Sequence, residues 1–384
     1  MQFFGSHLLR QRMDLGLSQT DLARKVGMSL SGYRKLERGQ AEPRPDTLKA
    51  LAGALRVPLR ELLTPAPSLH GVRFRSLKKL KSLSQILADV GRWLRDYAAL
   101  EQITGDECPA QNLQPLLDAI GQEPGSDIPR LAEIARRHFD LSEREPVHDI
   151  CGLLEAKDIK VYSVDVANDA FMGLSVAKGD GGPAIIVNTW ARLPVETWIF
   201  SAAHELGHLL LHLSAYEVDQ EHEDTHQERE ANEFASHFLM PEPIFLKEWG
   251  DTAGLALVDR VLKVKRVFRV SWRTVLFRVA QRMPAERRQF LWQRFNLDYQ
   301  ARSGRSLLKH DEPIGASRDH YDGDYGRPMG KEPESMERHD FQSDRLYRLV
   351  RRAVEEELIS LSRAAEILRL PLVEMRELSA SWVV

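Results

Sequence analysis

Two histidines and a glutamate form the strongest chemical signal in the sequence. His204, Glu205 and His208 make an H-E-x-x-H motif. In a helix, residues four apart lie about 6 Å from each other on one face, so two imidazoles can bind one metal ion. Glu205 follows the first histidine directly, where its carboxylate can take a proton from water at the metal. The motif therefore predicts a hydrolytic metal centre with Glu205 as the catalytic base.

The stretch that must carry this motif is apolar nearly all round. Residues 195 to 212 read VETWIFSAAHELGHLLLH, and a helix without a polar face is buried. This favours a metal centre over the alternative that the histidines lie by chance on a solvated face. Gly207 costs roughly 1 kcal/mol in mid-helix relative to alanine. We therefore expect another part of the chain to approach the backbone closely there.

The third ligand must come from another element. His212 lies eight residues beyond His204, roughly 12 Å along a helix axis, which is too far for one ion to bind both. The next helical stretch, residues 227 to 240, carries Glu228 inside its apolar stripe and Asn232 one turn later. Glu228 is the expected ligand and Asn232 the expected hydrogen-bond partner of a ligand. The alternative for Glu228 is an acid favoured at a helix N-terminus by the macrodipole.

Two other acids on this helix are less suited to the role. Glu233 points to the opposite face of the helical wheel, and Glu230 lies at the margin of the apolar stripe.

Together the two stretches resemble the ImmA/IrrE family of zinc-dependent metallopeptidases. The resemblance rests on HELGHLLLH and on E-x-x-A-N-x-F-A-x-x-x-L-M-P at residues 228–241. It implies a gluzincin-like domain with one zinc ion per chain, and it carries over His204, His208 and Glu228 as ligands and Glu205 as base. Thermolysin-like enzymes have E-x-x-x-D at the third ligand, which supports Glu228 over Glu230. Manganese and iron are the alternative metals.

Two short apolar runs before the motif predict β-strands, at residues 171–175 and 183–188. The family resemblance implies that the second is the edge strand against which an extended peptide lies.

The start of the chain has the pattern of short helices joined by tight turns. Ser18 and Ser29 are expected helix caps, and Gly27 and Gly39 end the two helices. Residues 5–63 resemble the Cro/repressor-type (XRE) helix-turn-helix domain. Residues 1–63 hold 11 Lys and Arg against 6 Asp and Glu, a net charge of 11 − 6 = +5, which favours double-stranded DNA as a partner.

The resemblance assigns DNA contacts to individual positions. Gln19 and Arg38 are expected at phosphates, whereas Leu30, Ser31 and Lys35 are expected at base edges in the major groove. Including Ser29 and Arg34, the candidates are Gln19, Ser29, Leu30, Ser31, Arg34, Lys35 and Arg38. Leu30 offers only apolar contact and Gly32 weakens the helix, which argues against strong sequence readout. A protein-docking module is the alternative.

The remaining chain is expected to be mainly helical. Residues 72–103 predict an amphipathic helix or helical hairpin. Its basic start is expected to be a solvated helix face, and contact with phosphates is the alternative. Residues 260–278 contain seven basic residues and no acid, which indicates either a packed helical support or a further DNA contact. Residues 359–378 again resemble a helix-turn-helix, and dimerisation, giving a homodimer, is an equal alternative for them.

The expected fold class is therefore mainly α with a small β-sheet (α+β). The expected domains are a helix-turn-helix domain (1–64), a helical connector (65–125), a metallopeptidase core (126–250), a helix-turn-helix-like subdomain (251–300), a glycine- and proline-rich flexible linker (301–340) and a C-terminal helical region (341–384).

Composition narrows the protein class further. The 384 residues are 43% hydrophobic and 28% charged, with a net charge of −3, as in ordinary globular proteins. Two cysteines, Cys108 and Cys151, are too few for a disulfide framework or a thiolate zinc site, which fits the cytoplasm. We see no signal peptide and no run of the ~20 apolar residues that span a bilayer.

These features predict a cytoplasmic DNA-binding regulator joined to a zinc endopeptidase. The resemblance implies a protein substrate, such as a repressor cut at one exposed segment. One alternative is a catalytically silent transcription factor whose peptidase-like domain senses a ligand or a protein partner. An antitoxin-like regulator is a third possibility.

Overall fold

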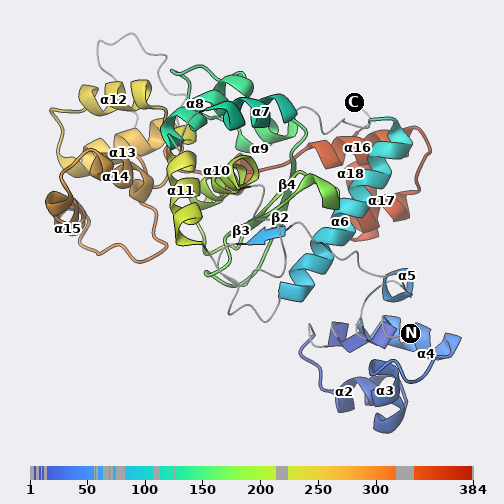
Figure 1. Cartoon of the computed structure of the whole chain (residues 1–384). Coiled ribbons are helices and arrows are strands. Elements are labelled where there is room, and N and C mark those ends of the chain that lie inside the picture. The colour runs from blue at the N-terminus through green and yellow to red at the C-terminus, as the bar shows by residue number, and fades with distance from the viewer. Residues whose placement is uncertain are drawn as a thin grey trace. The chain divides into compact units, whose positions relative to one another are not determined.

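The protein is mainly helical with a small β-sheet, as the sequence predicts (Figure 1). The computed structural model describes residues 4–5, 8–9, 11–12, 15–55, 57, 59–63, 69, 72–74, 83–106, 113–123, 127–212, 224–316 and 333–382. The chain divides into two compact units. The first comprises Met1–Leu69 and Lys79–Asp96, and the second His70–Lys78 and Tyr97–Val384.

The first unit packs short helices around a small apolar core. They are α2 (Gln19–Lys25), α3 (Leu30–Glu37), α4 (Pro45–Leu55) and α5 (Leu59–Leu63), followed by the first part of α6 (Leu83–Thr104). Ser18 and Asp21 form a capping box at α2, and Ser29 caps α3 by accepting a hydrogen bond from the Gly32 amide. Gly27 makes the turn between them with a φ of 68°, a conformation that glycine adopts without strain.

The second unit is built on a four-stranded sheet in the order β1-β3-β4-β2. Its strands are β1 (Val72–Phe74), β2 (Lys160–Val164), β3 (Gly173–Val176) and β4 (Ala184–Asn188). The pairs β1–β3 and β3–β4 are antiparallel, and β2–β4 is parallel. All residues of β3 and β4 are buried, as expected of strands covered on both faces.

Two expectations are wrong, one about the position of a strand and one about the start of the connector. The strand at residues 184–188 is central rather than at the edge, because β2 and β3 flank it on its two sides. The connector does not begin as a solvated helix face, since residues 72–74 form strand β1 and Arg73 is buried there. The helical part of the connector is confirmed by α6. The basic residues 75, 78, 79 and 81, and the proline-rich residues 64–67, lie outside the described residues.

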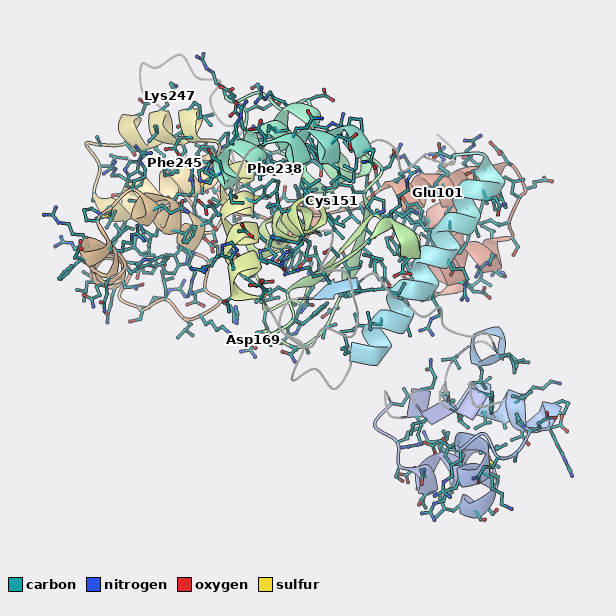
Figure 2. The ribbon with its side chains drawn as sticks, viewed as in Figure 1. Glu101, Cys151, Asp169, Phe238, Phe245 and Lys247 are labelled. Carbon is teal, nitrogen blue, oxygen red and sulfur yellow. The ribbon has the colours of Figure 1, made fainter. Side chains whose placement is uncertain are left out.

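Helices cover the sheet and carry the H-E-x-x-H motif. They are α7 (Gln114–Gln122), α8 (Ile128–His138), α9 (Ile150–Glu155), α10 (Val195–Leu211) and α11 (Thr225–Leu239), with a short 3-10 helix, η1 (Lys178–Asp180), between strands. Helix α10 packs on β3 and β4, and α11 packs on α10 and α8. Phe238 of α11, labelled in Figure 2, lies in the core that these elements share.

A second group of helices follows α11 in the chain. It comprises α12 (Glu242–Asp251), α13 (Leu257–Phe268), α14 (Trp272–Gln281) and α15 (Ala285–Ser303). Its basic residues make internal contacts: Arg260 stacks 3.8 Å from the Trp249 ring centre, and Arg278 pairs with Glu242 at 2.6 Å. These contacts favour the packed support over a DNA contact.

Residues 312–316, within the segment expected to be a flexible linker, pack against helices of the second unit. The amide of Trp272 donates to Glu312, and the amide of Ala316 donates to the carbonyl of Leu262. Lys265 also pairs with Glu312 at 3.2 Å, because a buried ammonium needs an acidic partner. Residues 317–332 lie outside the described residues.

A buried ionic network joins the C-terminal helices to the rest of the second unit. They are α16 (Arg345–Glu355), α17 (Leu361–Leu368) and α18 (Leu372–Ala380), preceded by the 3-10 helix η4 (Arg338–Asp340). Glu101, labelled in Figure 2, pairs with Arg345 and with Lys160, both at 2.9 Å. Glu155 accepts the backbone amides of residues 344 and 345. Burial raises the pKa of Glu155 to about 7, against the opposing effect of these amides.

Among the described residues, no helix combines the length and the apolar character needed to cross a membrane.

Candidate metal centre

Helix α10 presents His204, Glu205 and His208 inside the second unit. Fourteen of its residues are buried, and each of these three side chains is only about 1% exposed. The prediction of a buried helix is confirmed, and the two imidazoles share a face. Their Nε2 atoms lie 3.0 Å apart.

Helix α11 brings Glu228 to these two imidazoles. Its carboxylate oxygens lie 3.1 Å from His208 Nε2 and 3.3 Å from His204 Nε2. His204, His208 and Glu228 thus form one cluster whose ligand atoms are close enough for a single metal ion. The structure brings together the three residues that the sequence selected as ligands.

A missing side chain allows α11 to approach so closely. A Cβ atom built on Gly207 would lie 3.1 Å from the Phe234 ring and 3.3 Å from the Cα atom of Ala231. The close backbone approach expected at Gly207 is therefore made by α11. A side chain at this position would require Phe234 and Ala231 of α11 to shift by a few tenths of an ångström.

Hydrogen bonds determine which histidine nitrogen faces the cluster. Asn232 Oδ1 lies 3.1 Å from His204 Nδ1, and an amide oxygen only accepts. Nδ1 of neutral His204 therefore carries the proton, which leaves a lone pair on Nε2. Asn232 occupies the position expected for a hydrogen-bond partner of a ligand.

His208 is oriented in the same way through His212. The Nδ1 atoms of the two rings lie 2.9 Å apart, and His212 Nε2 lies 3.1 Å from Glu230 Oε2. Because the Glu230 carboxylate accepts a hydrogen bond from Nε2–H of His212, Nδ1 of neutral His212 carries no proton and can accept a hydrogen bond from Nδ1–H of His208. His208 Nε2 then keeps its lone pair. The sequence excluded His212 and Glu230 as ligands but did not predict this supporting role.

His208 and His212 are held in the neutral form. Burial lowers the pKa of His208 to about 3, although Glu228 opposes this shift. Burial also lowers the pKa of His212, against the effect of Glu230.

These features fit a zinc ion. Two imidazole lone pairs and a carboxylate point at one another across 3.0 to 3.3 Å, an arrangement that is repulsive without a cation. Tetrahedral zinc with bonds of 2.0–2.1 Å separates its ligand atoms by about 3.3 Å. Three protein ligands leave the fourth position for water or substrate, as in catalytic zinc sites.

Strand β3 holds the candidate base in place. The Ser175 hydroxyl donates to Glu205 Oε2 at 2.8 Å. A Cβ atom on Gly173 would lie 3.3 Å from Glu205 Cγ and 2.8 Å from the carbonyl of Ile186, so only glycine leaves room for this carboxylate. Sequence reasoning placed residues 173 and 175 on a strand but did not predict their contacts with the base.

A buried arginine from β1 also reaches the metal centre. Arg73 donates to Gln227, and its Nη2 lies 4.0 Å from Glu228 Oε1. Sequence reasoning missed this residue because it precedes Glu228 by more than 150 positions, and only the pairing of β1 with β3 brings it near. The only local signal was an arginine within an alternating V-R-F triplet.

In the first unit, the expected DNA-contacting residues gather on and around α3. Ser29, Ser31, Arg34, Lys35 and Arg38 are exposed. Leu30 and Gln19 are half-buried. Ser29 serves as the N-cap of α3, so its hydroxyl already has a structural role.

Gln19 and Arg34 belong to a polar network that braces α2 against α3. Gln19 donates to Glu37 at 2.9 Å and accepts from Arg34 at 3.2 Å. Arg12 pairs with the same glutamate at 2.7 Å. These hydrogen bonds hold the Gln19 side chain in place at the start of α2, where the resemblance expects a phosphate contact.

Comparison with known families agrees with both regions. A helix-turn-helix family model matches residues 8–62. A model of the IrrE N-terminal-like domain, a peptidase family, matches residues 154–280, which include all three candidate ligands and Glu205. No curated protein gives a match to the chain. The chain therefore joins a helix-turn-helix DNA-binding domain to a domain of the IrrE N-terminal-like peptidase family.

Proposed function

We propose that the chain is a DNA-binding regulator with a zinc-dependent endopeptidase in its second unit, which hydrolyses a peptide bond in a regulatory protein such as a repressor. The observation that carries the proposal is the meeting of three metal-ligand atoms from α10 and α11 beside Glu205. His204, His208 and Glu228 would hold the ion, and Asn232 and His212 would orient the two imidazoles.

The chemistry divides between the ion and the protein. When bound, zinc supplies Lewis acidity, which makes water a better nucleophile and a peptide carbonyl a better electrophile. Glu205 accepts the proton of the attacking water and delivers it to the departing amine. Because Ser175 hydrogen-bonds Oε2, the carboxylate is held in one orientation.

The proposed function also explains why a DNA-binding domain and a peptidase domain occur in one chain. A peptidase tethered to DNA is kept near proteins that bind the same DNA, which raises their effective concentration. A repressor is therefore a suitable substrate class.

Replacement of the base tests this function. We expect Glu205→Gln to lose about 10²- to 10⁴-fold in cleavage rate, the usual contribution of a general base, while it retains one zinc per chain. Zinc is measured by elemental mass spectrometry, and cleavage by identifying new protein N-termini in extracts of the source cells treated with either protein. His204→Ala is the matched control, which loses both zinc and cleavage. Equal cleavage by wild type and Glu205→Gln would rule out the assigned role.

A further inference from the structure

Strand β1 lies beside the strand that holds the candidate base. It pairs with β3, and Arg73 is directly opposite Ser175, the residue that hydrogen-bonds Glu205. β3 is the strand of the sheet whose residues contact the base. An extended peptide that adds to a sheet does so along such an edge, and here β1 already fills it.

The strand comes from outside the peptidase-family domain. The family match begins at residue 154, whereas β1 ends at Phe74, so 154 − 74 = 80 positions separate them. Among the described residues, its ladder with β3 contains three residue pairs.

Arg73 extends this cover over the metal centre. Cross-strand partners project from the same face of a sheet, so the Arg73 side chain points to the side on which Ser175 meets Glu205. It is buried against Gln227 and Glu228. A guanidinium at this place fills space beside the ligands and puts a positive charge next to the position of a metal cation. The ligands and the base beneath are nearly inaccessible.

We propose that β1 is an autoinhibitory strand. It occupies the edge of β3 that an extended segment of the protein substrate must pair with, and Arg73 covers the metal centre until β1 leaves. The inference rests on the proposed peptidase function for the identity of the competing segment. Its closure of the metal centre can be tested without any cleavage.

The test locks and releases the strand in the full-length protein. Val72 and Val176 are buried cross-strand partners, so Val72→Cys with Val176→Cys can be joined by a disulfide with diamide and released with a thiol. Zinc transfer to the chromogenic chelator pyridylazoresorcinol is then timed. We expect the oxidised protein to release zinc at least tenfold more slowly than the reduced protein. The single Val72→Cys variant, treated with the same oxidant, should be unaffected.

Arg73→Ala supplies a second test that needs no disulfide. Loss of a nearby positive charge alone would strengthen metal binding and slow zinc release. If Arg73 covers the metal centre, its removal should speed both zinc entry and zinc release by about tenfold or more. The zinc affinity should then change little. Arg192→Ala, at an exposed position, is the matched control.

The outcomes separate the inference from the proposed function. Zinc release that is the same in locked, released and Arg73→Ala proteins overturns the inference, whatever the cleavage assay gives. Release that depends on β1 supports it, even if Glu205→Gln shows that no peptide bond is cut. With an active enzyme, the locked protein should also lose cleavage and regain it on reduction.

Discussion

His212 contacts the metal centre through the ring of His208. Its Nδ1 accepts from His208, and its Nε2 donates to Glu230. Partners of this kind fix the ring orientation of a ligand, and their loss typically costs 10- to 100-fold in metal affinity. His212 therefore belongs to the site although it lies too far along α10 to bind the ion.

We expect His212→Ala to bind zinc about 10- to 100-fold more weakly than wild type, as measured by competition with a chromogenic chelator. His212→Asn should recover much of the loss, because its side-chain oxygen can take the place of Nδ1 as acceptor. His226→Ala removes an exposed histidine that contacts the same oxygen of Glu230 and should change little. Equal affinities in His212→Ala and wild type would show that His212 only fills space.

Local periodicity was sufficient to find the residues that lie on the two helices. His204, Glu205, His208 and Glu228 follow from helical spacing and from the apolar face that each helix buries. Asn232 follows one turn after Glu228. Arg73 and Ser175 do not follow, because their contacts depend on which strands pair, and strand pairing is decided by residues far apart in the sequence.

Helices α10 and α11 form a unit whose spacing depends on Gly207. The absent Cβ lets the Cα atom of Ala231 come close to α10, and this spacing sets the distance from Glu228 to both imidazoles. The glycine thus matters for metal geometry as well as for packing.

Substitution at Gly207 separates these effects. Alanine favours a helix by up to about 1 kcal/mol over glycine, but overpacking costs typically 1–3 kcal/mol. We expect Gly207→Ala to lower the unfolding free energy by about 1 kcal/mol and to weaken zinc binding. Both are measurable by thermal unfolding and chelator competition. Gly121→Ala lies in helix α7 with no atom within 4 Å of the added Cβ, so it should be neutral or stabilising. A Gly207→Ala protein that is more stable and binds zinc normally would contradict this account.

The positions of two strands could be predicted from the sequence, but the order of the strands in the sheet could not. The alternation and the apolar runs predicted strands at residues 171–175 and 183–188, and the structure has β3 and β4 there. The order of the strands was wrong because two outer strands, β1 and β2, come from separate parts of the chain. The uniformly buried residues of β4 were the available signal that it is central.

At the scale of the whole molecule, the DNA-binding activity should be independent of the peptidase. Arg38 is exposed at the C-cap of α3 and is assigned to a phosphate. We expect Arg38→Ala to weaken binding to a mixed-sequence 30-base-pair duplex and to reduce the slope of log affinity against log salt by about 0.9, the effect of one lost phosphate contact. Fluorescence anisotropy at several salt concentrations measures this.

Lys49→Ala removes the same charge from an exposed position on α4 and should leave the slope nearly unchanged, and Glu205→Gln should bind like wild type. An unchanged slope in Arg38→Ala would place the phosphate contacts elsewhere and favour the protein-docking alternative for this domain.

The buried ionic network has a consequence for the order of events during synthesis. Glu155 and the amide of Arg345 are 190 positions apart, yet they hydrogen-bond in the folded second unit. Arg345 also follows the last residue of the family match, residue 280, by 345 − 280 = 65 residues. At roughly 5–20 residues per second, the ribosome adds this stretch in about 3 to 13 s. Glu101 and Glu155 therefore acquire their C-terminal partners only after helices α10 and α11 have been made, so the second unit is completed only near the end of synthesis.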